Sequence, residues 1–198
     1  MPKRNKKTII VGLTGGIGTG KSTIASQFKQ IKIPVFDSDK EVDKLYKEKN
    51  KGLMNIIKNI TNSKEVIKKG QINKKLLGDI VFNNRKKLLL LESYVYKKLD
   101  VQRKLFIQKY KKQNKKIIVL DTPLLFEKKI DKICDYTVVA KAPLKKRIKR
   151  LLKRPGLTKK KIIRIRKKQL PEKIKIKRAD FVVQTDKGKW YSLNKVRK

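Results

Sequence analysis

The chain has 198 residues, which is the length of one domain with room for small inserted subdomains. It contains 57 lysine and arginine residues against 16 aspartate and glutamate residues, a formal charge of +41, with no histidine and a single cysteine, Cys134. This composition excludes histidine-based acid–base catalysis, histidine metal sites, Ser-His-Asp triads and intramolecular disulfides. Any general base must therefore be an aspartate, a glutamate or a lysine.

The large positive charge has two interpretations. It would attract a polyanion such as nucleic acid or an anionic membrane, or it reflects lysine replacing other surface residues throughout the chain, as AT-rich coding DNA would produce. The lysines are spread over the whole length and few aromatic residues are interleaved with them, which favours the second interpretation. We therefore expect no specific nucleic-acid partner. We also expect the protein to be a monomer or a weak homo-oligomer.

Neither the apolar runs nor the amino terminus indicates a membrane segment. No run approaches the roughly 20 residues that span a bilayer. The apolar stretch after the basic start "MPKRNKK" is short and rich in glycine, unlike a signal peptide. With one cysteine, a reducing compartment is expected. These features predict a soluble, cytoplasmic protein without a membrane partner.

Short β-branched runs, taken in chain order, predict strands at 8–13, 33–37, 116–121 and 136–140, with a fifth candidate at 180–184. Longer, helix-like segments separate these runs. This alternation is typical of an α/β fold with a central, mostly parallel sheet.

Two helical segments interrupt the strand pattern. The first, about 39–113, lacks convincing strands and has helical apolar spacing, for example at Leu91, Val95 and Leu99. We therefore expect an all-helical insertion, which would bind the substrate that accepts a transferred group. The second, 144–178, is very basic and is broken at "RPGLT" and "QLP". The predicted organisation is a core of about 1–38, 114–150 and 179–198, an acceptor subdomain of about 39–113 and a lid of about 151–178.

The first predicted strand leads into a phosphate-binding loop. "GGIGTGKS", from Gly15 to Ser22, satisfies G-x-x-x-x-G-K-[ST] between a strand and a helix start, which is the context that this motif requires. Backbone N–H groups and the helix N-terminus are expected to hold the phosphates of ATP. Lys21 is expected on the β- and γ-phosphates and the Ser22 hydroxyl on Mg²⁺. The expected ATP-binding residues of this segment are Gly16, Ile17, Gly18, Thr19, Gly20, Lys21, Ser22 and Thr23.

Carboxylates end two of the predicted strands. Asp121 follows "IIVL" as in a Walker B strand, where it would hold Mg²⁺ or its water, although an Asp also commonly ends a strand as a turn residue. Asp37 and Asp39 follow the second strand. They would either cap the next helix or provide the base that takes the proton from an attacking hydroxyl. The residues alone leave these alternatives open.

Three arginines in "KKRIKRLLKRPGLT" are spaced by three and four residues. Arg147, Arg150 and Arg154 would share roughly one helical face. They form either a solvated basic face or the inner side of a lid whose charges stabilise the transferring phosphoryl group.

The order and spacing of the motifs resemble the dephospho-CoA kinase family over about residues 9–188. The residues that carry the resemblance are "VGLTGGIGTGKSTIA", "VFDSD", "GQINKKLLGDIVFNN", "LDTPLLFE", "APLKKRIKRLLKRPGLT", "QLPEKIKIKRAD" and "FVVQTDKG". The resemblance implies a P-loop nucleoside-kinase-like, three-layer fold with a helical CoA-binding insertion and a helical lid. It implies ATP-dependent phosphorylation of the ribose 3′-hydroxyl of dephospho-CoA, the last step of coenzyme A biosynthesis, with Mg²⁺.

The resemblance also implies residue roles. Asp39 is the base or hydroxyl-orienting residue, and Lys21 and Arg150 stabilise the γ-phosphoryl group. Arg150 and Arg154 join the ATP-binding residues, and Asp37, Asp39, Asp121 and Leu124 bind the acceptor. The sequence departs from the family pattern in three places: Tyr96-Lys97 stands where His-Pro is usual, Asp43 where Arg is common, and Arg147 where Gln is more usual.

Two other functions are consistent with parts of the sequence. A small P-loop kinase acting on a nucleoside or nucleoside monophosphate would share the loop. A P-loop ATPase that binds nucleic acid would share the loop and explain the charge.

Overall fold

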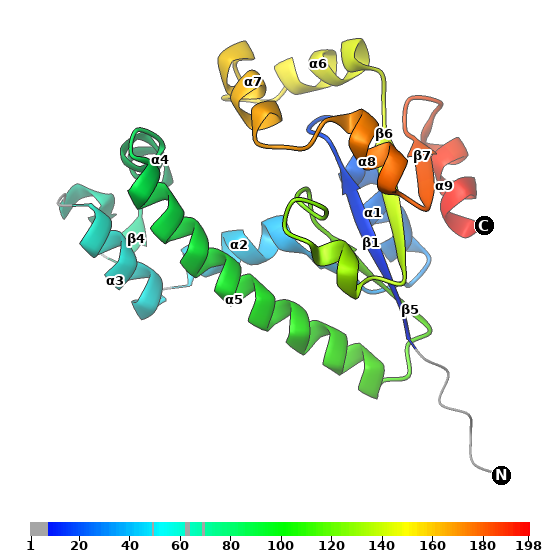
Figure 1. Cartoon of the computed structure of the whole chain (residues 1–198), viewed down its shortest axis with the longest axis horizontal. Coiled ribbons are helices and arrows are strands. Elements are labelled where there is room, and N and C mark those ends of the chain that lie inside the picture. The colour runs from blue at the N-terminus through cyan, green and yellow to red at the C-terminus, as the bar shows by residue number, and fades with distance from the viewer. Residues whose placement is uncertain (1–7, 49, 62–63, 69) are drawn as a thin grey trace. The chain divides into compact units, whose positions relative to one another are not determined.

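The computed structural model describes residues 8–48, 50–61, 64–68 and 70–198. These form two compact units, which are described separately (Figure 1). The core unit comprises Met1–Asp37 and Ile107–Lys198, and the insertion unit comprises Ser38–Phe106.

The core unit is built on a five-stranded sheet in the order β2-β5-β1-β6-β7, and every described pair of neighbouring strands is parallel. All five predicted strands are confirmed: β1 (Ile9–Gly15), β2 (Val35–Asp37), β5 (Ile117–Asp121), β6 (Tyr136–Lys141) and β7 (Phe181–Gln184). Continuous apolar runs such as "IIVL" form these strands because a parallel sheet is covered on both faces.

The two faces of this sheet are covered by different segments (Figure 1). On one face, Val11 and Leu13 pack with Ile24 and Phe28 of α1 (Lys21–Gln30) and with Val196 of α9 (Lys189–Arg197). On the other face, Gly12 lies against Leu125 and Cys134, so close that a β-carbon there would be 2.9 Å from both side chains. Gly12 is therefore needed for the segment 122–134, which includes the 3₁₀ helix η2 (Ile130–Ile133), to approach β1. The core unit is thus an α/β structure of three layers, as predicted.

Three basic helices follow β6 in the core unit: α6 (Leu144–Leu152), α7 (Lys159–Lys167) and α8 (Glu172–Arg178). Thr158 caps α7, its side chain accepting a hydrogen bond from Lys161 N. The predicted breaks at 154–158 and 169–171 are confirmed. The prediction that Arg154 shares a helical face with Arg147 and Arg150 is wrong, because α6 ends at Leu152 and Pro155-Gly156 prevent its continuation.

The insertion unit contains α2 (Ser38–Lys47), α3 (Lys51–Ile60), α4 (Lys74–Phe82) and the amino-terminal part of α5 (Arg85–Lys112). Asn50 and Asn73 cap α3 and α4 by accepting hydrogen bonds from backbone N–H groups three residues on. Its core includes Leu53, Ile57, Leu77, Leu91, Val95 and Leu99. Three of these belong to the helical pattern from which α5 was predicted.

The expectation that the insertion is all helical needs one correction. After η1 (Lys64–Val66), strands β3 (Ile67–Lys68) and β4 (Gln71–Ile72) pair antiparallel. Each strand has two residues, too few to produce an alternating apolar pattern in the sequence.

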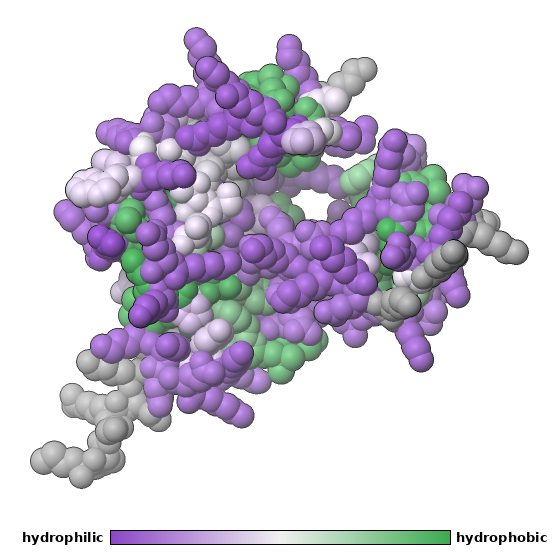
Figure 2. Space-filling view, turned by 180° about the vertical axis from the view of Figure 1, so that it is seen from behind, coloured by the Kyte–Doolittle hydropathy of each residue, from purple (hydrophilic) through white to green (hydrophobic). Residues whose placement is uncertain are grey.

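Hydrophilic residues cover most of the face shown in Figure 2, in both units. The hydrophilic surface of this face is thus not confined to one unit. No helix among the described residues is both long and apolar enough to cross a membrane.

Candidate active site

The phosphate-binding loop connects β1 to α1 in the core unit. Gly18 and Gly20 have φ angles of 78° and 85°, which residues with a side chain rarely adopt. The loop is closed by Thr19, whose backbone N–H and hydroxyl both donate to Gly16 O, at 3.2 and 2.8 Å. Gly20 precedes α1 and offers no side chain to cap it, so no capping side chain competes with an anion at the start of this helix. The loop has the local structure of a phosphate cradle.

Lys21, the first residue of α1, faces the end of the neighbouring strand β5. Its Nζ lies 2.6 Å from Asp121 Oδ1, and the two side chains are 15 % and 3 % exposed. The register of the strands explains this ion pair, because Asp121 pairs with Leu13 of β1 on one side and with Asp37 of β2 on the other. The carboxyl ends of β1, β2 and β5 therefore bring together Lys21, Asp121 and Asp37 at the edge where ligands bind in open α/β sheets.

Asp37 and Asp39 fall on different elements. Asp37 is the last residue of β2 and is half-buried, whereas Asp39 lies in the first turn of α2, in the insertion unit. A carboxylate in a first turn is favoured by the helix dipole. The position of Asp39 thus suits a helix-stabilising role.

The segment after β5 carries Leu124, the fourth predicted acceptor residue. Leu124 is half-buried, while the adjacent Leu125 and Phe126 are buried in the core. The segment is bonded to the phosphate-binding strand, since Thr122 N donates to Leu13 O at 3.0 Å and Thr14 Oγ1 donates to Pro123 O at 3.2 Å. The segment therefore lies against the carboxyl end of β1, where the phosphate-binding loop begins.

The three arginines have three different environments. Arg150 is half-buried and donates from Nη1 to Thr185 Oγ1 (3.1 Å) and from Nη2 to Thr185 O (3.0 Å). Thr185 in turn donates to Thr19 O in the phosphate-binding loop. Arg150 is thus connected to the loop through one intervening residue, Thr185. Arg154, by contrast, is exposed.

Arg147 is the residue that stands where the family usually has Gln. It is 4 % exposed, donates from Nε to Ile17 O (2.9 Å) and pairs with Glu172 (3.1 Å). Burial lowers the pKa of Arg147, and Glu172 opposes this effect. Its guanidinium covers the start of the loop, because a β-carbon on Gly16 would be 2.5 Å from Nη2. This departure from the family pattern is therefore accommodated by an ion pair and a bond to the loop.

The other two departures lie in the insertion unit. Asp43 is exposed and pairs with Lys74 at 2.7 Å. Tyr96 packs at the edge of the unit's core. Both residues have structural contacts of their own.

A cavity of about 540 Å³ opens beside Gly16. Its charged and polar lining comes from the three basic helices and their connections: Arg147, Arg166, Lys167, Gln169 and Glu172. Arg166, Lys167, Gln169 and Glu172 were not singled out from the sequence as site residues. Arg166 and Lys167 stand in a segment so rich in lysine and arginine that its composition gives no means of distinguishing them.

Lys175 and Glu127 are two further residues that sequence reasoning did not select. Lys175 is completely buried, and its Nζ donates to Pro123 O (2.7 Å) and pairs with Glu127 (2.9 Å). Burial lowers the pKa of Lys175, while Glu127 opposes the change. A signal was present in "QLPEKIK", where Gln169, Glu172 and Lys175 recur every third residue.

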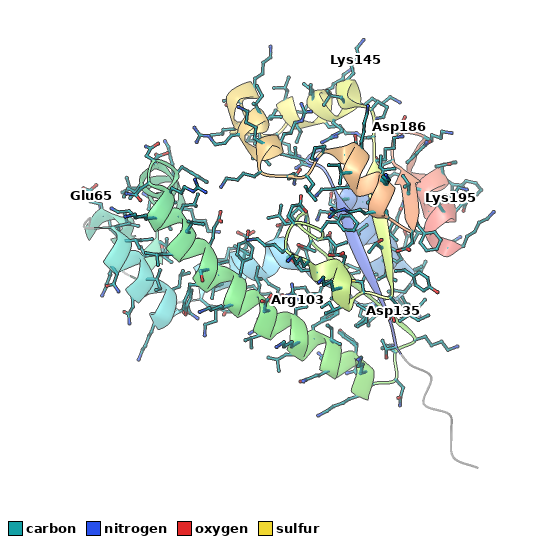
Figure 3. The ribbon with its side chains drawn as sticks, viewed as in Figure 1. Glu65, Arg103, Asp135, Lys145, Asp186 and Lys195 are labelled. Atoms are coloured by element: carbon teal, nitrogen blue, oxygen red, sulfur yellow. The ribbon has the colours of Figure 1, made fainter. Side chains whose placement is uncertain are left out.

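The two ends of the sheet differ in their chemistry (Figure 3). At the amino end, Asp135 extends the hydrogen bonding of β1, its carboxylate accepting from Ile10 N at 2.8 Å. At the other end, Asp186 follows β7 near the start of α6, with Lys146 Nζ 3.3 Å from its backbone oxygen. The groups suited to phosphate chemistry are therefore at the carboxyl end.

A phosphate cradle between the central strand of a parallel sheet and α1, with a strand-end carboxylate against the loop lysine, defines a P-loop nucleotide-binding protein. The dephospho-CoA kinase family model matches residues 9–189, and the chain belongs to that family, a family of ATP-dependent kinases that catalyses the last step of coenzyme A biosynthesis.

Individual relatives agree with this assignment. A dephospho-CoA kinase of Bartonella quintana is 41 % identical over 178 residues, covering 90 % of this chain and 89 % of the relative. The crystal structure of TT1252 from Thermus thermophilus has a TM-score of 0.79 at 30 % identity, over 96 % of this chain and 94 % of that one. Dephospho-CoA kinase from Campylobacter jejuni shares the fold, with a TM-score of 0.66 at 23 % identity over the same shares.

Proposed function

We propose that this enzyme transfers the γ-phosphoryl group of ATP to the ribose 3′-hydroxyl of dephospho-CoA, giving coenzyme A and ADP. The observation that carries the proposal is the Lys21–Asp121 pair beside the P-loop, in a chain that belongs to this kinase family over residues 9–189. In the reaction the 3′-oxygen forms a bond to the γ-phosphorus, the bond to the leaving ADP oxygen breaks, and the hydroxyl proton passes to a base.

On the donor side, the segment from Gly16 to Thr23 binds the ATP phosphates, with backbone N–H groups of the loop donating to phosphate oxygens. Lys21 stabilises the charge on the β- and γ-phosphates and is held in place by Asp121 until ATP binds. Arg150 and Arg154 complete the donor site. Arg150 is attached to the loop through Thr185, so a small movement of α6 would bring its guanidinium to the phosphates.

On the acceptor side, Asp39 accepts the proton of the 3′-hydroxyl or orients that hydroxyl. In a protein without histidine a carboxylate is the natural base. Asp37, Asp121 and Leu124 contribute to acceptor binding. Asp37 and Asp121 are register partners on β2 and β5, which supports their acting on one ligand.

The residues present fit a magnesium ion. Asp121 places a carboxylate at the carboxyl end of β5, and Ser22 offers an exposed hydroxyl in the first turn of α1. Both donors are oxygens, the ligands that Mg²⁺ prefers. When bound, Mg²⁺ neutralises charge on the β- and γ-phosphates, and Asp121 would reach it through a water molecule.

The partners of the enzyme are ATP and dephospho-CoA, and the working form is a monomer or a weak homo-oligomer. The dispersed lysines support compositional drift rather than a nucleic-acid site, because a site would cluster them. A single cysteine supports action in the reducing cytoplasm.

ADP release with a panel of acceptors tests the proposed function. Dephospho-CoA, AMP, dTMP and shikimate would be compared at equal concentrations with ATP and Mg²⁺. We expect turnover with dephospho-CoA alone. Efficient turnover of AMP or dTMP with none of dephospho-CoA would identify a nucleoside monophosphate kinase instead.

A further inference from the structure

Three side chains of the segment Gln169–Lys175 reach three different parts of the site. Gln169 Oε1 accepts from Ile17 N in the phosphate-binding loop at 3.0 Å. Glu172 accepts from Arg147 of α6 at 3.1 Å. Lys175 Nζ donates to Pro123 O, in the segment after β5, at 2.7 Å. All of these residues belong to the core unit.

On the donor side, the segment holds the loop at one residue. The N–H of Ile17 is bonded to Gln169, and the carbonyl oxygen of Ile17 accepts from Arg147, which is itself paired with Glu172. Both backbone polar groups of Ile17 are therefore fixed, directly or through one residue, by the segment 169–175.

On the acceptor side, the same segment holds both ends of Pro123–Glu127. Pro123 O receives hydrogen bonds from Lys175 and, at 3.2 Å, from Thr14 of β1. Glu127 Oε1 receives them from Lys175 at 2.9 Å and from Leu170 N at 2.7 Å. Pro123 is two residues from Asp121, so holding Pro123 in place also limits the movement of Asp121 relative to Lys21.

A completely buried lysine paired with a glutamate is a poor choice for stability alone. Such pairs are often replaced by apolar residues with no loss of stability, because the attraction barely offsets the cost of removing two charges from water. What an apolar residue cannot do is donate to a carbonyl and a carboxylate at once. The feature that Lys175 supplies is therefore a fixed geometry.

We propose that Lys175 is a positioning residue for phosphoryl transfer: together with Gln169 and Glu172 it fixes the acceptor-side segment 123–127 relative to the phosphate-binding loop. The proposal deepens the proposed kinase function and rests on it. In-line transfer needs the donor and acceptor oxygens aligned, and a displacement of about 1 Å costs up to ~10²-fold in rate. Lys175 does not touch either substrate in this account.

The test compares Lys175→Met with Lys177→Met, an exposed lysine on the same helix. Methionine has similar length and flexibility but donates no hydrogen bond. For Lys175→Met we expect kcat with dephospho-CoA to fall at least ~10-fold, while the Kd for ATP and the KM for dephospho-CoA change less than ~3-fold. Lys177→Met should match the wild type in all three.

A second variant separates positioning from stability. Lys175→Met combined with Glu127→Leu removes both buried charges, so its Tm should return to within about 5 °C of the wild type. We expect its kcat to remain low. A kcat restored to the wild-type value in the double variant, or unchanged in Lys175→Met, would overturn the proposal, as would the failure of both variants to fold, since Lys175 would then be a structural brace.

The wild-type enzyme distinguishes this inference from the proposed function. If the wild type does not phosphorylate dephospho-CoA, the function is wrong. If the wild type is active and the Lys175 variants equal it, only the positioning role is wrong.

Discussion

Lys21 and Asp121 form an ion pair beside the phosphate-binding loop, at the proposed donor site. Both side chains are largely buried, and they are 2.6 Å apart at the carboxyl end of the sheet. In the proposed site, the Lys21 ammonium group would contact the phosphates when ATP binds and would then interact less with Asp121. The pair therefore keeps the lysine in position between catalytic cycles.

Replacing Lys21 should damage both binding and rate. For Lys21→Ala we expect the Kd for ATP to rise and kcat to fall by ~10²-fold or more, because a charge that stabilises the transition state is lost. Titration with ATP and steady-state kinetics measure the two effects. Normal ATP affinity together with a normal rate would contradict the assignment of the loop as the donor site.

Asp39 and Asp43 lie on the same helix and offer a matched comparison. Asp39→Asn should lower kcat by ~10²-fold or more, the typical contribution of a general base, with little change in the Kd for ATP. Asp43→Asn removes only an exposed pair with Lys74 and should leave kcat near the wild-type value. If Asp39→Asn turns over normally, Asp39 serves only to stabilise the start of α2.

At the scale of elements, β6 and β7 are fastened at their amino ends by one side chain. Asp180 Oδ2 accepts from Thr137 N (2.7 Å) and Thr137 Oγ1 (2.8 Å), just before β7 begins. The hydrogen bonds from Thr137 lower the pKa of Asp180 below its ordinary value of 3.8. The ionised carboxylate therefore stabilises the edge of the sheet.

This carboxylate makes stability depend on pH in a defined direction. Because the pKa is lower in the folded state, the contribution is present above pH 3.8 and is lost as the pH falls through the folded-state pKa. Asp180→Asn should cost about 1 kcal/mol in the free energy of unfolding at pH 7, since the site is solvent-exposed. The difference from the wild type should shrink below pH 4.

Urea unfolding at pH 7 and in acid measures this difference, with the exposed Asp79→Asn as a control. An Asp180→Asn effect that is the same at both pH values would contradict the role of the charge.

The strands of the core were predictable because each lies in a short apolar run that stands out from the charged sequence around it. Runs such as 117–121 predict buried strands, and the glycines of the loop identify the turn between β1 and α1. The paired strands β3 and β4 were not predictable, since two residues form no run. The predicted helical face was wrong for Arg154 because Pro155-Gly156 end the helix before its spacing from Arg150 can apply.

The site was only partly predictable for a different reason. Lys21 and Asp121 stand in motifs whose chemistry is readable. Lys175 and Glu127 are paired across 48 residues, and in a chain so rich in lysine the composition does not separate a buried lysine from an exposed one. Burial and long-range pairing appear only in the folded structure.

At the scale of the whole molecule, the charge of +41 requires a prediction of its own. If the lysines are dispersed and not a nucleic-acid site, binding to DNA or RNA should be weak and should fall steeply with salt. ATP hydrolysis should not be stimulated by either nucleic acid at about 0.15 M salt. A stimulation of several-fold under these conditions would instead favour a nucleic-acid-dependent ATPase.

The chain passes from the core unit to the insertion unit between Asp37 and Ser38, next to the proposed base. The phosphate-binding loop lies in the core unit, and Asp39 is the second residue of the insertion unit, two residues after the end of β2. The chain thus passes directly from the strand-end carboxylate Asp37 to the proposed base.

The most direct measurement of this account is product formation from dephospho-CoA and its two deoxyribose analogues, followed by ³¹P NMR. We predict a new phosphomonoester on the 3′-carbon with dephospho-CoA and with the 2′-deoxy analogue, and no transfer to the 3′-deoxy analogue. Phosphorylation of the 3′-deoxy analogue, or ATP turnover indifferent to all three compounds, would contradict it.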